Sequence, residues 1–218
     1  MVAREAKSSP GLTQLLDAAR EAGVPVEDVP RSRIDALGVE DHQEVAAIVR
    51  PAPDLDERAL SQAAFDPDAL AVLLDGVTDP QNLGAAARAA EAAGAAMLIT
   101  RTRRAAPVSP AAIRASAGAL LHLPHARVAN LPRAIERLKE RGFLVIGLDE
   151  RAPRSIHEAP PPPRPLLLVV GSEGAGMSRL VREACDELVS IPMAGKVGSL
   201  NAAAALAVAL FGFALRPS

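Results

Sequence analysis

After residue 69 the sequence alternates regularly between short apolar runs and helical segments, and this alternation restricts the fold more than any other property of the chain. Five runs have the length and composition of buried strands: Leu70–Leu74, Ala96–Ile99, Phe143–Leu148, Leu166–Val170 and Glu187–Ile191. Strands that alternate with helices usually pair in parallel, because each helix returns the chain across a face of the sheet. The pattern predicts an α/β fold with a mostly parallel sheet and helices on both faces.

Two helices of this part have clear boundaries in the sequence. Asp79-Pro80 is an acidic cap followed by the one helical position that tolerates proline, so a helix is predicted from there to about Ala93. Its many alanines leave little side-chain bulk, so another segment can approach its backbone. The final helix, from Asn201 to about Leu215, is apolar nearly all round and is expected to be buried or to contribute to a subunit interface.

The first 68 residues follow a different pattern. Leu12–Ala22 is predicted to be a short amphipathic helix, Val24–Val29 a weaker strand candidate and Glu44–Val49 a stronger one. Arg50-Pro51-Ala52-Pro53 and the acidic stretch after it are typical of a linker, because closely spaced prolines do not fit inside regular structure. We therefore expect a truncated small α/β segment over residues 1–50, a linker over 51–68 and an α/β domain over 69–218.

The overall net charge of −2 conceals a division of charge along the chain. Residues 1–68 carry 14 acidic and 7 basic side chains, whereas residues 69–218 carry 12 acidic and 17 basic ones. Between residues 92 and 135 there is no Asp or Glu, and six arginines occur there: Arg101, Arg103, Arg104, Arg114, Arg127 and Arg133. Such a stretch suits contact with phosphates, although charge alone leaves dispersal over a solvated surface equally open.

Several classes of protein do not fit the sequence. The longest apolar run, 202–215, is shorter than the ~20 residues of a bilayer-spanning helix, and the N-terminus has no basic-then-apolar signal, so a soluble, cytoplasmic protein is expected. The single cysteine, Cys185, has no Cys or His at metal-ligand spacing, which predicts neither a disulfide nor a zinc site, and we expect it to be a small core residue. The glycines of 171–176 have the order G-x-x-G-x-G, late in the chain, which is wrong for a dinucleotide-binding fingerprint.

Three segments rich in glycine, asparagine and serine follow predicted strands: residues 75–91, 171–179 and 191–201. Ligands of open parallel sheets bind beyond the carboxyl ends of the strands, so these segments are expected to form one composite site. Ordinary loop glycine is the alternative. Glu173 can hydrogen-bond a hydroxyl or offset a cationic centre, or it can simply be a favourable charge at the start of a helix.

Other residues of these segments also have structural alternatives. Sequence alone favours an i,i+3 ion pair of Arg88 with Glu91 over a functional role for this arginine. Asn82 lies six positions before Arg88, so a joint role requires Asn82 at the helix entrance. Ser199 or Asn201 can cap the long apolar helix, and a cap can also hold a ligand.

Taken together, the three segments resemble the motifs of the SpoU-like RNA ribose methyltransferases of the SPOUT superfamily. Asp75–Gly84 with Arg88 is similar to the first motif, Val170–Gly174 with Gly176 to the second, and Ile191–Gly195 through Ser199–Asn201 to the third. The resemblance is strong over residues 69–218, and it is greatest to enzymes that methylate a guanosine ribose in large-subunit ribosomal RNA. Val24–Val49, including His42-Gln43, is more weakly similar to the second half of the family's RNA-binding domain.

The resemblance implies a C-terminal trefoil knot, a homodimer and a bent S-adenosylmethionine held mainly by backbone groups. Because the cofactor loses its positive charge as the methyl group transfers, the reaction needs no metal, and none is expected. Carried over by position, the residues that contact this cofactor are Gly171, Ile191 and Leu200. The residues that line the reaction centre are Asn82, Arg88, Glu173, Ser199 and Asn201. Because a guanidinium normally keeps its proton, we expect Arg88 to act as a cation that grips a phosphate rather than as a base.

The expected partner is RNA, with ribosomal RNA favoured over transfer RNA. The chain has no Trp or Tyr and only 4 Phe for base stacking, so arginines must supply the contacts: Arg101, Arg103, Arg104 and Arg114. A tRNA ribose methyltransferase and a non-catalytic RNA-binding or ribosome-associated protein on the same fold are the alternatives. A small-molecule enzyme with a nucleotide cofactor would need a glycine fingerprint after the first strand, and the sequence has none there.

Overall fold

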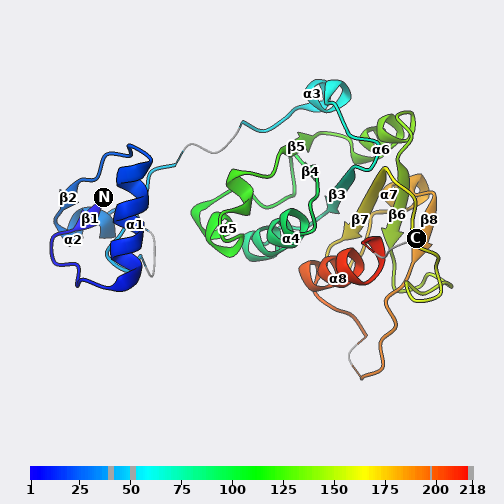
Figure 1. The fold of residues 1–218 in the computed structure, drawn as a ribbon. Coiled ribbons are helices and arrows are strands. Elements are labelled where there is room, and N and C mark those ends of the chain that lie inside the picture. Colours follow the sequence, from blue (N-terminus) through cyan, green and yellow to red (C-terminus); the bar gives the residue numbers. More distant parts are fainter. Residues whose placement is uncertain (39–41, 50–52, 197, 216–218) are drawn as a thin grey trace. The chain divides into compact units, whose positions relative to one another are not determined.

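The computed structural model describes residues 1–38, 42–49, 53–196 and 198–215, and the chain divides into two compact units, Met1–Arg50 and Pro51–Ser218. Figure 1 shows the helices and strands of both. In the described part of the chain, no helix is long and apolar enough to cross a membrane.

The first unit has a parallel two-stranded sheet and a very small core. Its elements are β1 (Val2–Ala3), α1 (Pro10–Glu21), β2 (Asp28–Val29) and α2 (Arg31–Asp35). Helix α1 begins where the Ser9 hydroxyl accepts a hydrogen bond from the backbone N–H of Leu12 at 3.2 Å, which confirms the predicted helix within two residues at its start. The core consists of Ala3, Val29 and Ile34, and α1 buries none of its residues.

The strands predicted for this unit are wrong in extent. The candidate Val24–Val29 shrinks to the two residues of β2, and Glu44–Val49 contributes only an isolated antiparallel bridge between Val45 and Val2. Ala46 packs against the small core, but Ile48 is 85% exposed and Val49 45%, so the second half of this apolar run has no surface to pack on within its unit. Strand preference depends on such packing, which the residue types alone do not supply.

The second unit is built on a sheet of six parallel strands in the order β5-β4-β3-β7-β6-β8. The strands are β3 (Leu70–Asp75), β4 (Met97–Arg101), β5 (His125–Val128), β6 (Leu144–Leu148), β7 (Leu166–Gly171) and β8 (Glu187–Val189). All five predicted strands are confirmed, each within two residues at either end. Strand β5 was missed because His125 and Arg127 interrupt its apolar pattern.

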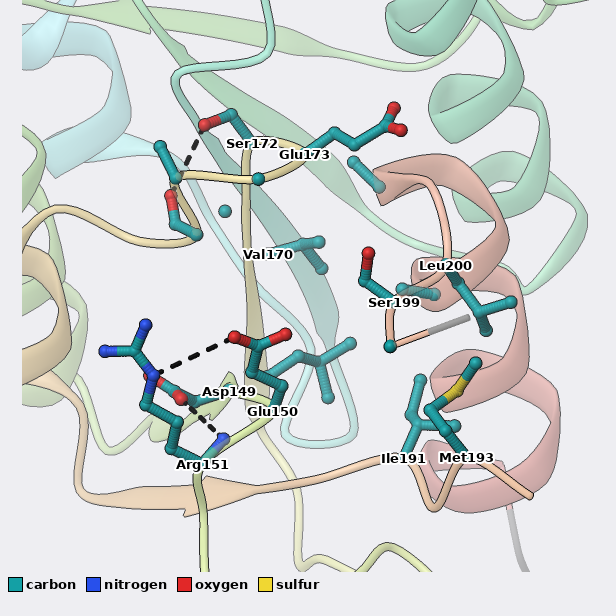
Figure 2. A pocket seen from close by; sticks show the side chains of 18 of the residues that line it. Asp149, Glu150, Arg151, Val170, Ser172, Glu173, Ile191, Met193, Ser199 and Leu200 are labelled. Carbon is teal, nitrogen blue, oxygen red and sulfur yellow. Dashed lines mark hydrogen bonds and ion pairs between the residues drawn. The ribbon is translucent and has the colours of Figure 1, made fainter. Parts of the chain in front are cut away.

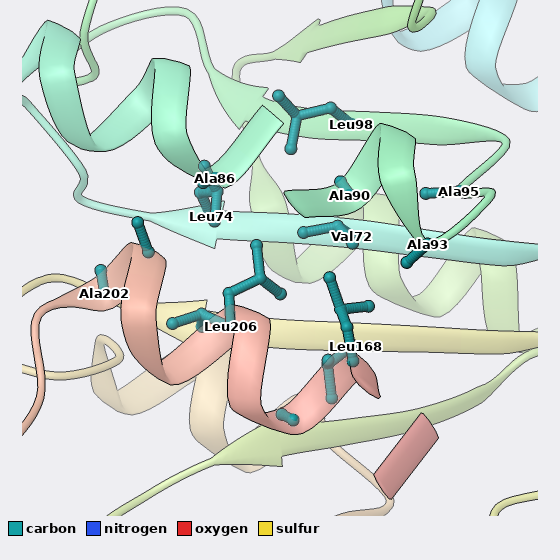
Figure 3. Close-up of a cluster of buried hydrophobic side chains, with 14 of the residues drawn as sticks. Val72, Leu74, Ala86, Ala90, Ala93, Ala95, Leu98, Leu168, Ala202 and Leu206 are labelled. Carbon is teal, nitrogen blue, oxygen red and sulfur yellow. The ribbon is translucent and has the colours of Figure 1, made fainter. Parts of the chain in front are cut away.

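Helices cover both faces of this sheet, as predicted. Along β3, Leu70, Val72 and Leu74 face one core, shown in part in Figure 3, and Ala71 and Leu73 face the other. The first core contains side chains of α4 (Pro80–Ala92), α5 (Pro110–Ala115), the 3-10 turn η1 (Ala119–Leu121), α8 (Ala202–Ala209) and its π-helical end η2 (Leu210–Ala214). The second core contains side chains of α3 (Glu57–Gln62), α6 (Leu131–Lys139) and α7 (Arg179–Ala184).

Helix α4 begins and ends as the sequence predicts. The Asp79 carboxylate caps it by accepting from the backbone N–H of Gln81 at 3.1 Å, and Gly94 follows it with φ +73°. Its small residues allow α5 and α8 to pack against it. At Gly84 an added Cβ would lie 2.4 Å from the carbonyl oxygen of Ala112, so only glycine permits this approach of α5.

The stretch expected to be a linker, 51–68, is largely structured over its described part. The backbone N–H of Leu55 donates to the His125 carbonyl at 2.8 Å, and Leu60 of α3 is buried in the second core. Phe65 packs edge-on against Phe143 with ring centroids 5.1 Å apart. These apolar residues, spaced between acidic ones, attach the stretch to the second unit; Arg50, Pro51 and Ala52 lie outside the described residues.

Candidate functional site

A cavity lies at the carboxyl ends of the neighbouring strands β7, β6 and β8, next to the start of α8 (Figure 2). It is lined by residues 148–151 at the end of β6 and beyond it, 170–176 at the end of β7 and beyond it, Ile191 and Met193 after β8, Arg182 of α7, and residues 198–200 with Ala202 and Ala205 of α8. Ligands of parallel sheets bind at this edge, because the loops that follow the strands converge there.

Five residues singled out from the sequence lie around this one cavity: Gly171, Glu173, Ile191, Ser199 and Leu200. Figure 2 shows four of them, all but Gly171, labelled around the same opening. The side chains of Glu173 and Ser199 are exposed and make no hydrogen bond or ion pair with the described part of the chain. Both side chains are therefore available to a ligand.

Asn201 occupies the position directly before α8. Its side-chain oxygen accepts a hydrogen bond from the backbone N–H of Ala204 at 2.7 Å, so it is the helix cap that the sequence allowed. Its neighbour Leu200 lines the cavity. The cap thereby fixes the direction in which the third segment enters the helix.

Asn82 and Arg88 do not line the cavity. Both lie on α4, Asn82 half-buried in the first turn and Arg88 exposed on a later one. The ion pair of Arg88 with Glu91, which sequence alone favoured, is absent, and the Arg88 guanidinium has no partner among the residues that the structure describes. Helix α4 packs against α8, the helix that follows the third segment, so this free cation lies in the same helical layer as α8.

The loop from Gly171 to Met177, here called the glycine loop, depends on a close approach of its own backbone. An added Cβ at Gly171 would lie 2.1 Å from the carbonyl carbon of Gly176 and 2.2 Å from the nitrogen of Met177. The backbone N–H of Ser172 donates to the Gly176 carbonyl at 3.1 Å, and that of Gly176 donates back at 2.9 Å. The loop thus closes on itself and presents the backbone of residues 173–175 to the cavity.

The segment after β6 is a part of the lining that sequence reasoning missed. Asp149, Glu150 and Arg151 line the cavity, and Arg182 forms an ion pair with the Asp149 carboxylate at 2.6 Å. The Asp149 side chain is only 7% exposed. The signal that could have found these residues is their place directly after a predicted strand, the same rule that selected the other segments.

The arginines predicted to bind RNA differ in their surroundings. Arg103 and Arg104 are exposed in the loop after β4 and form no ion pair within the described ranges, whereas Arg101 lies 3.3 Å from the buried Asp75 carboxylate. Arg114 is exposed near the end of α5. At the end of β4, Arg103 and Arg104 are therefore positive charges that no described carboxylate offsets.

Cys185 does not form a second reactive centre. It is half-buried against the second core, as expected of a small core residue, and its Sγ donates to the Val181 carbonyl at 3.3 Å. Burial raises the pKa of its thiol to about 12, with Asp186 adding to the effect. The thiol stays protonated at neutral pH and is a poor nucleophile.

Comparisons with known proteins agree with this geometry. A family model described as the SpoU rRNA Methylase family matches residues 69–211, and one described as RNA 2'-O ribose methyltransferase substrate binding matches residues 1–55. An "Uncharacterized tRNA/rRNA methyltransferase" of Mycobacterium ulcerans is 43% identical over 201 residues, which are 91% of this chain and 64% of the relative. The "23S rRNA (guanosine-2'-O-)-methyltransferase RlmB" of Pseudomonas putida is 41% identical over 209 residues, 95% of this chain and 84% of the relative.

Among solved structures, the SpoU methyltransferase AviRb from Streptomyces viridochromogenes, in complex with the cofactor AdoMet, is similar with a TM-score of 0.77 and 32% sequence identity. The match covers 96% of this chain and 79% of the AviRb chain. The present chain spans 64% of the length of the M. ulcerans relative. The SpoU methylase match extends over the sheet, the cavity and all three glycine- and asparagine-bearing segments. This chain therefore belongs to the SpoU rRNA methylase family.

Proposed function

We propose that this protein transfers a methyl group from S-adenosylmethionine to a ribose 2′-hydroxyl of structured RNA, with a guanosine of ribosomal RNA as the favoured target. The observation that carries the proposal is the meeting of Gly171, Glu173, Ile191, Ser199 and Leu200 at one cavity. Membership of the SpoU family and the similarity to the P. putida enzyme support the choice of reaction and target. A tRNA ribose is the second candidate, because the name of the M. ulcerans relative includes both RNAs.

The lining of the cavity fits S-adenosylmethionine. Leu148, Val170, Ile191 and Leu200 supply apolar surface for an adenine ring, and the glycine loop supplies backbone hydrogen-bonding groups. The Glu173 carboxylate, which has no partner among the described residues, would offset a positive charge of the cofactor, whereas Asp149 is already paired with Arg182 and Glu150 with Arg151. When bound, S-adenosylmethionine supplies an electrophilic methyl group on a sulfonium sulfur. The proposed reaction includes no metal, and the described residues contain no group of three His, Cys, Asp or Glu side chains that would hold one.

Side chains around this cavity would orient and polarise the ribose hydroxyl. A 2′-hydroxyl is a weak nucleophile at neutral pH, so its position relative to the methyl group determines much of the rate. Ser199 and Glu173 have free polar atoms at the cavity, and we assign the orientation of the hydroxyl to Ser199. Asn82, which does not line the cavity of its own chain, would assist it from α4. Glu173 would hydrogen-bond the sugar or balance the cationic cofactor. Asn201 keeps its backbone position as the cap of α8.

Arg88 would act as a cation. A guanidinium carries a fixed positive charge and several N–H donors, so Arg88 can grip the phosphate beside the target ribose and stabilise the developing alkoxide. Because Arg88 does not line the cavity of its own chain, we propose a homodimer that supplies the cation across the interface. The outer side of α8 and η2 supports this assignment, since Val208, Phe211 and Leu215 are 40%, 54% and 40% exposed there.

RNA would contact the arginine loop, defined as residues 102–104 after β4. The free guanidiniums of Arg103 and Arg104 suit phosphate contacts, and Arg114 extends the basic surface along α5. Arg101 would take a smaller part, since its charge is offset by Asp75. We assign RNA recognition also to residues 1–50, methyl transfer to 69–218 and their connection to 51–68; the substrate-binding family match supports the first assignment. The cytoplasm, where RNA and S-adenosylmethionine meet, is the expected location.

Mapping of 2′-O-methylation in RNA from cells with and without this gene tests the proposal. We expect one ribose, in ribosomal RNA, to lose its methyl group without the gene and to regain it with the wild-type gene. A gene that carries Ser199→Ala should restore little of the modification, whereas Ser61→Ala, an exposed substitution in α3, should restore it fully. Identical methylation maps with and without the gene would refute the proposed function.

A further inference from the structure

The side chain of Asp75, the last residue of β3, connects three segments of the second unit. Its Oδ2 accepts a hydrogen bond from the backbone N–H of Ser178 at 2.7 Å, directly before α7. Its Oδ1 accepts one from Nη2 of Arg101, the last residue of β4, at 3.3 Å. The Asp75 side chain is only 5% exposed. A buried carboxylate needs such partners, because it has lost its hydration.

The contact with Ser178 closes the glycine loop. In the parallel pairing of β3 with β7, Asp75 lies beside Gly171, where the glycine loop begins. The loop returns to Asp75 at Ser178, so both of its ends lie next to the same residue. Residues 171–176, six of the seven residues of the glycine loop, all line the cavity. The Ser178 side chain makes no capping hydrogen bond to α7, so its backbone N–H is the group that ties the loop end to Asp75.

The contact with Arg101 reaches the arginine loop. Arg101 is 30% exposed at its side chain, and its Nε is buried without a hydrogen-bond partner in the described chain, so this guanidinium already lacks one contact. Removal of the Asp75 charge would leave the cation without its counter-ion, which is costly for a partly buried group. Asp75 therefore connects the end of β4, from which the arginine loop departs, with the loop that lines the cavity.

We propose that Asp75 is a positioning residue for methyl transfer, whose carboxylate holds the glycine loop in its cofactor-binding shape and fixes the end of β4, where the arginine loop begins. The inference rests on the proposed function, because it states how the same cavity keeps its form. Asp75 does not line the cavity, so it acts through the loop and not by contact with the cofactor.

Two substitutions of Ser178 test this role without a change to Asp75. Ser178 has φ −61°, a value that proline adopts, so Ser178→Pro removes the N–H that donates to Asp75. Ser178→Ala keeps that N–H and serves as the matched control. We expect Ser178→Pro to weaken the affinity for S-adenosylmethionine about tenfold, as the loss of a hydrogen bond to a charged group implies, and Ser178→Ala to bind like the wild type. Titration calorimetry, at a temperature well below unfolding, measures both.

Asp75→Asn is the direct substitution, because it keeps the shape of the side chain and removes its charge. We expect about tenfold weaker binding of S-adenosylmethionine and also weaker binding of RNA. Asp186→Asn is its control: Asp186 likewise accepts from a backbone N–H, that of Val145 at 2.9 Å, and pairs with a cation, Lys139 at 2.8 Å, but it does not line the cavity. Asp186→Asn should lower the melting temperature and leave both affinities unchanged.

Wild-type affinity for S-adenosylmethionine in folded Ser178→Pro and Asp75→Asn would overturn the positioning role. An equal loss of affinity in Asp186→Asn would overturn it too, because the effect would then be general destabilisation. If Asp75→Asn does not fold, the comparison of Ser178→Pro with Ser178→Ala decides. Failure of the proposed function is a separate result, in which the wild-type protein itself binds no S-adenosylmethionine or methylates no RNA.

Discussion

Substitution of Gly171 by alanine should strongly weaken cofactor binding, because the new methyl group would occupy the space of the glycine loop's own backbone. The added Cβ would lie 2.1, 2.2 and 2.4 Å from three backbone atoms of Gly176 and Met177, whereas ordinary contacts begin at 3.4 Å. These atoms belong to the main chain and cannot rotate away. The return arm of the loop must therefore move by roughly 1 Å, and a misplacement of about 1 Å in a site costs on the order of 100-fold in activity.

The same overlap should lower stability. Overpacking of a filled interior costs about 1–3 kcal/mol, which lowers the melting temperature of a chain of this size by several degrees. Gly84→Ala is the control for stability, since its Cβ would lie 2.4 Å from the Ala112 carbonyl oxygen, on the α4–α5 contact and outside the cavity. Gly195→Ala is the control for substitution in the site segments, because nothing lies within 4 Å of its added Cβ.

Thermal unfolding with and without S-adenosylmethionine separates these effects. The wild type and Gly195→Ala should unfold at the same temperature and be stabilised equally by the cofactor, as binding to the folded state requires. Gly84→Ala should unfold earlier and still be stabilised by a similar amount. Gly171→Ala should unfold earlier and be stabilised far less by the same concentration of cofactor. A normal cofactor-dependent increase in Gly171→Ala would refute the account of the glycine loop.

Three further predictions concern other parts of the second unit. Arg88→Lys should retain substantial methyl transfer if Arg88 acts as a cation, whereas total loss with intact RNA binding, measured side by side, would indicate a base or a bidentate clamp. The combined change Arg103→Ala and Arg104→Ala should weaken RNA binding and reduce the dependence of log K on log salt by about 1–2, and an unchanged slope would remove both arginines from the interface. Burial lowers the pKa of His125, although Asp54 lies 3.3 Å from its Nδ1 and opposes the shift. The unfolded chain therefore binds a proton more readily than the folded one. The stability that neutral His125 contributes is present above about pH 6.5 and is lost as the pH falls towards the lowered pKa of the folded state. His125→Gln should reduce this part of the pH dependence of thermal unfolding, and an unchanged pH profile would contradict the argument.

The fold of the second unit was largely predictable because its strands are buried on both faces. Runs such as Leu70–Leu74 and Leu166–Val170 are apolar throughout, and burial on both faces of a parallel sheet produces that pattern. Strand β5 escaped prediction because its edge position admits Arg127, paired with Asp54 at 3.2 Å. The order of the strands does not follow from their sequences. The pattern of strands and helices could not indicate a trefoil knot either, because general rules of topology disfavour knots, and the knot stays a prediction.

The cavity was predictable in part for the same physical reason. Position after a strand selected the glycine loop and the segment 191–201, and both line the cavity. The same rule would have selected Asp149, but the segment Asp149–Arg151 after β6 contains no glycine, asparagine or serine, the residue types by which the other segments were chosen. The partners of Asp75 could not be predicted, because Arg101 and Ser178 lie 26 and 103 residues away in the chain and only the sheet brings them together.

The position of the transferred methyl group tests the central claim most directly. The purified protein would be incubated with ribosomal RNA and S-adenosylmethionine that carries an isotopically labelled methyl group, and the RNA would be digested to nucleosides for mass spectrometry. We expect the label on the ribose 2′-oxygen, chiefly of guanosine, with little transfer by the Ser199→Ala protein. Label on a base, or none on RNA from a protein that binds the cofactor, would contradict the assignment of this cavity to ribose methylation.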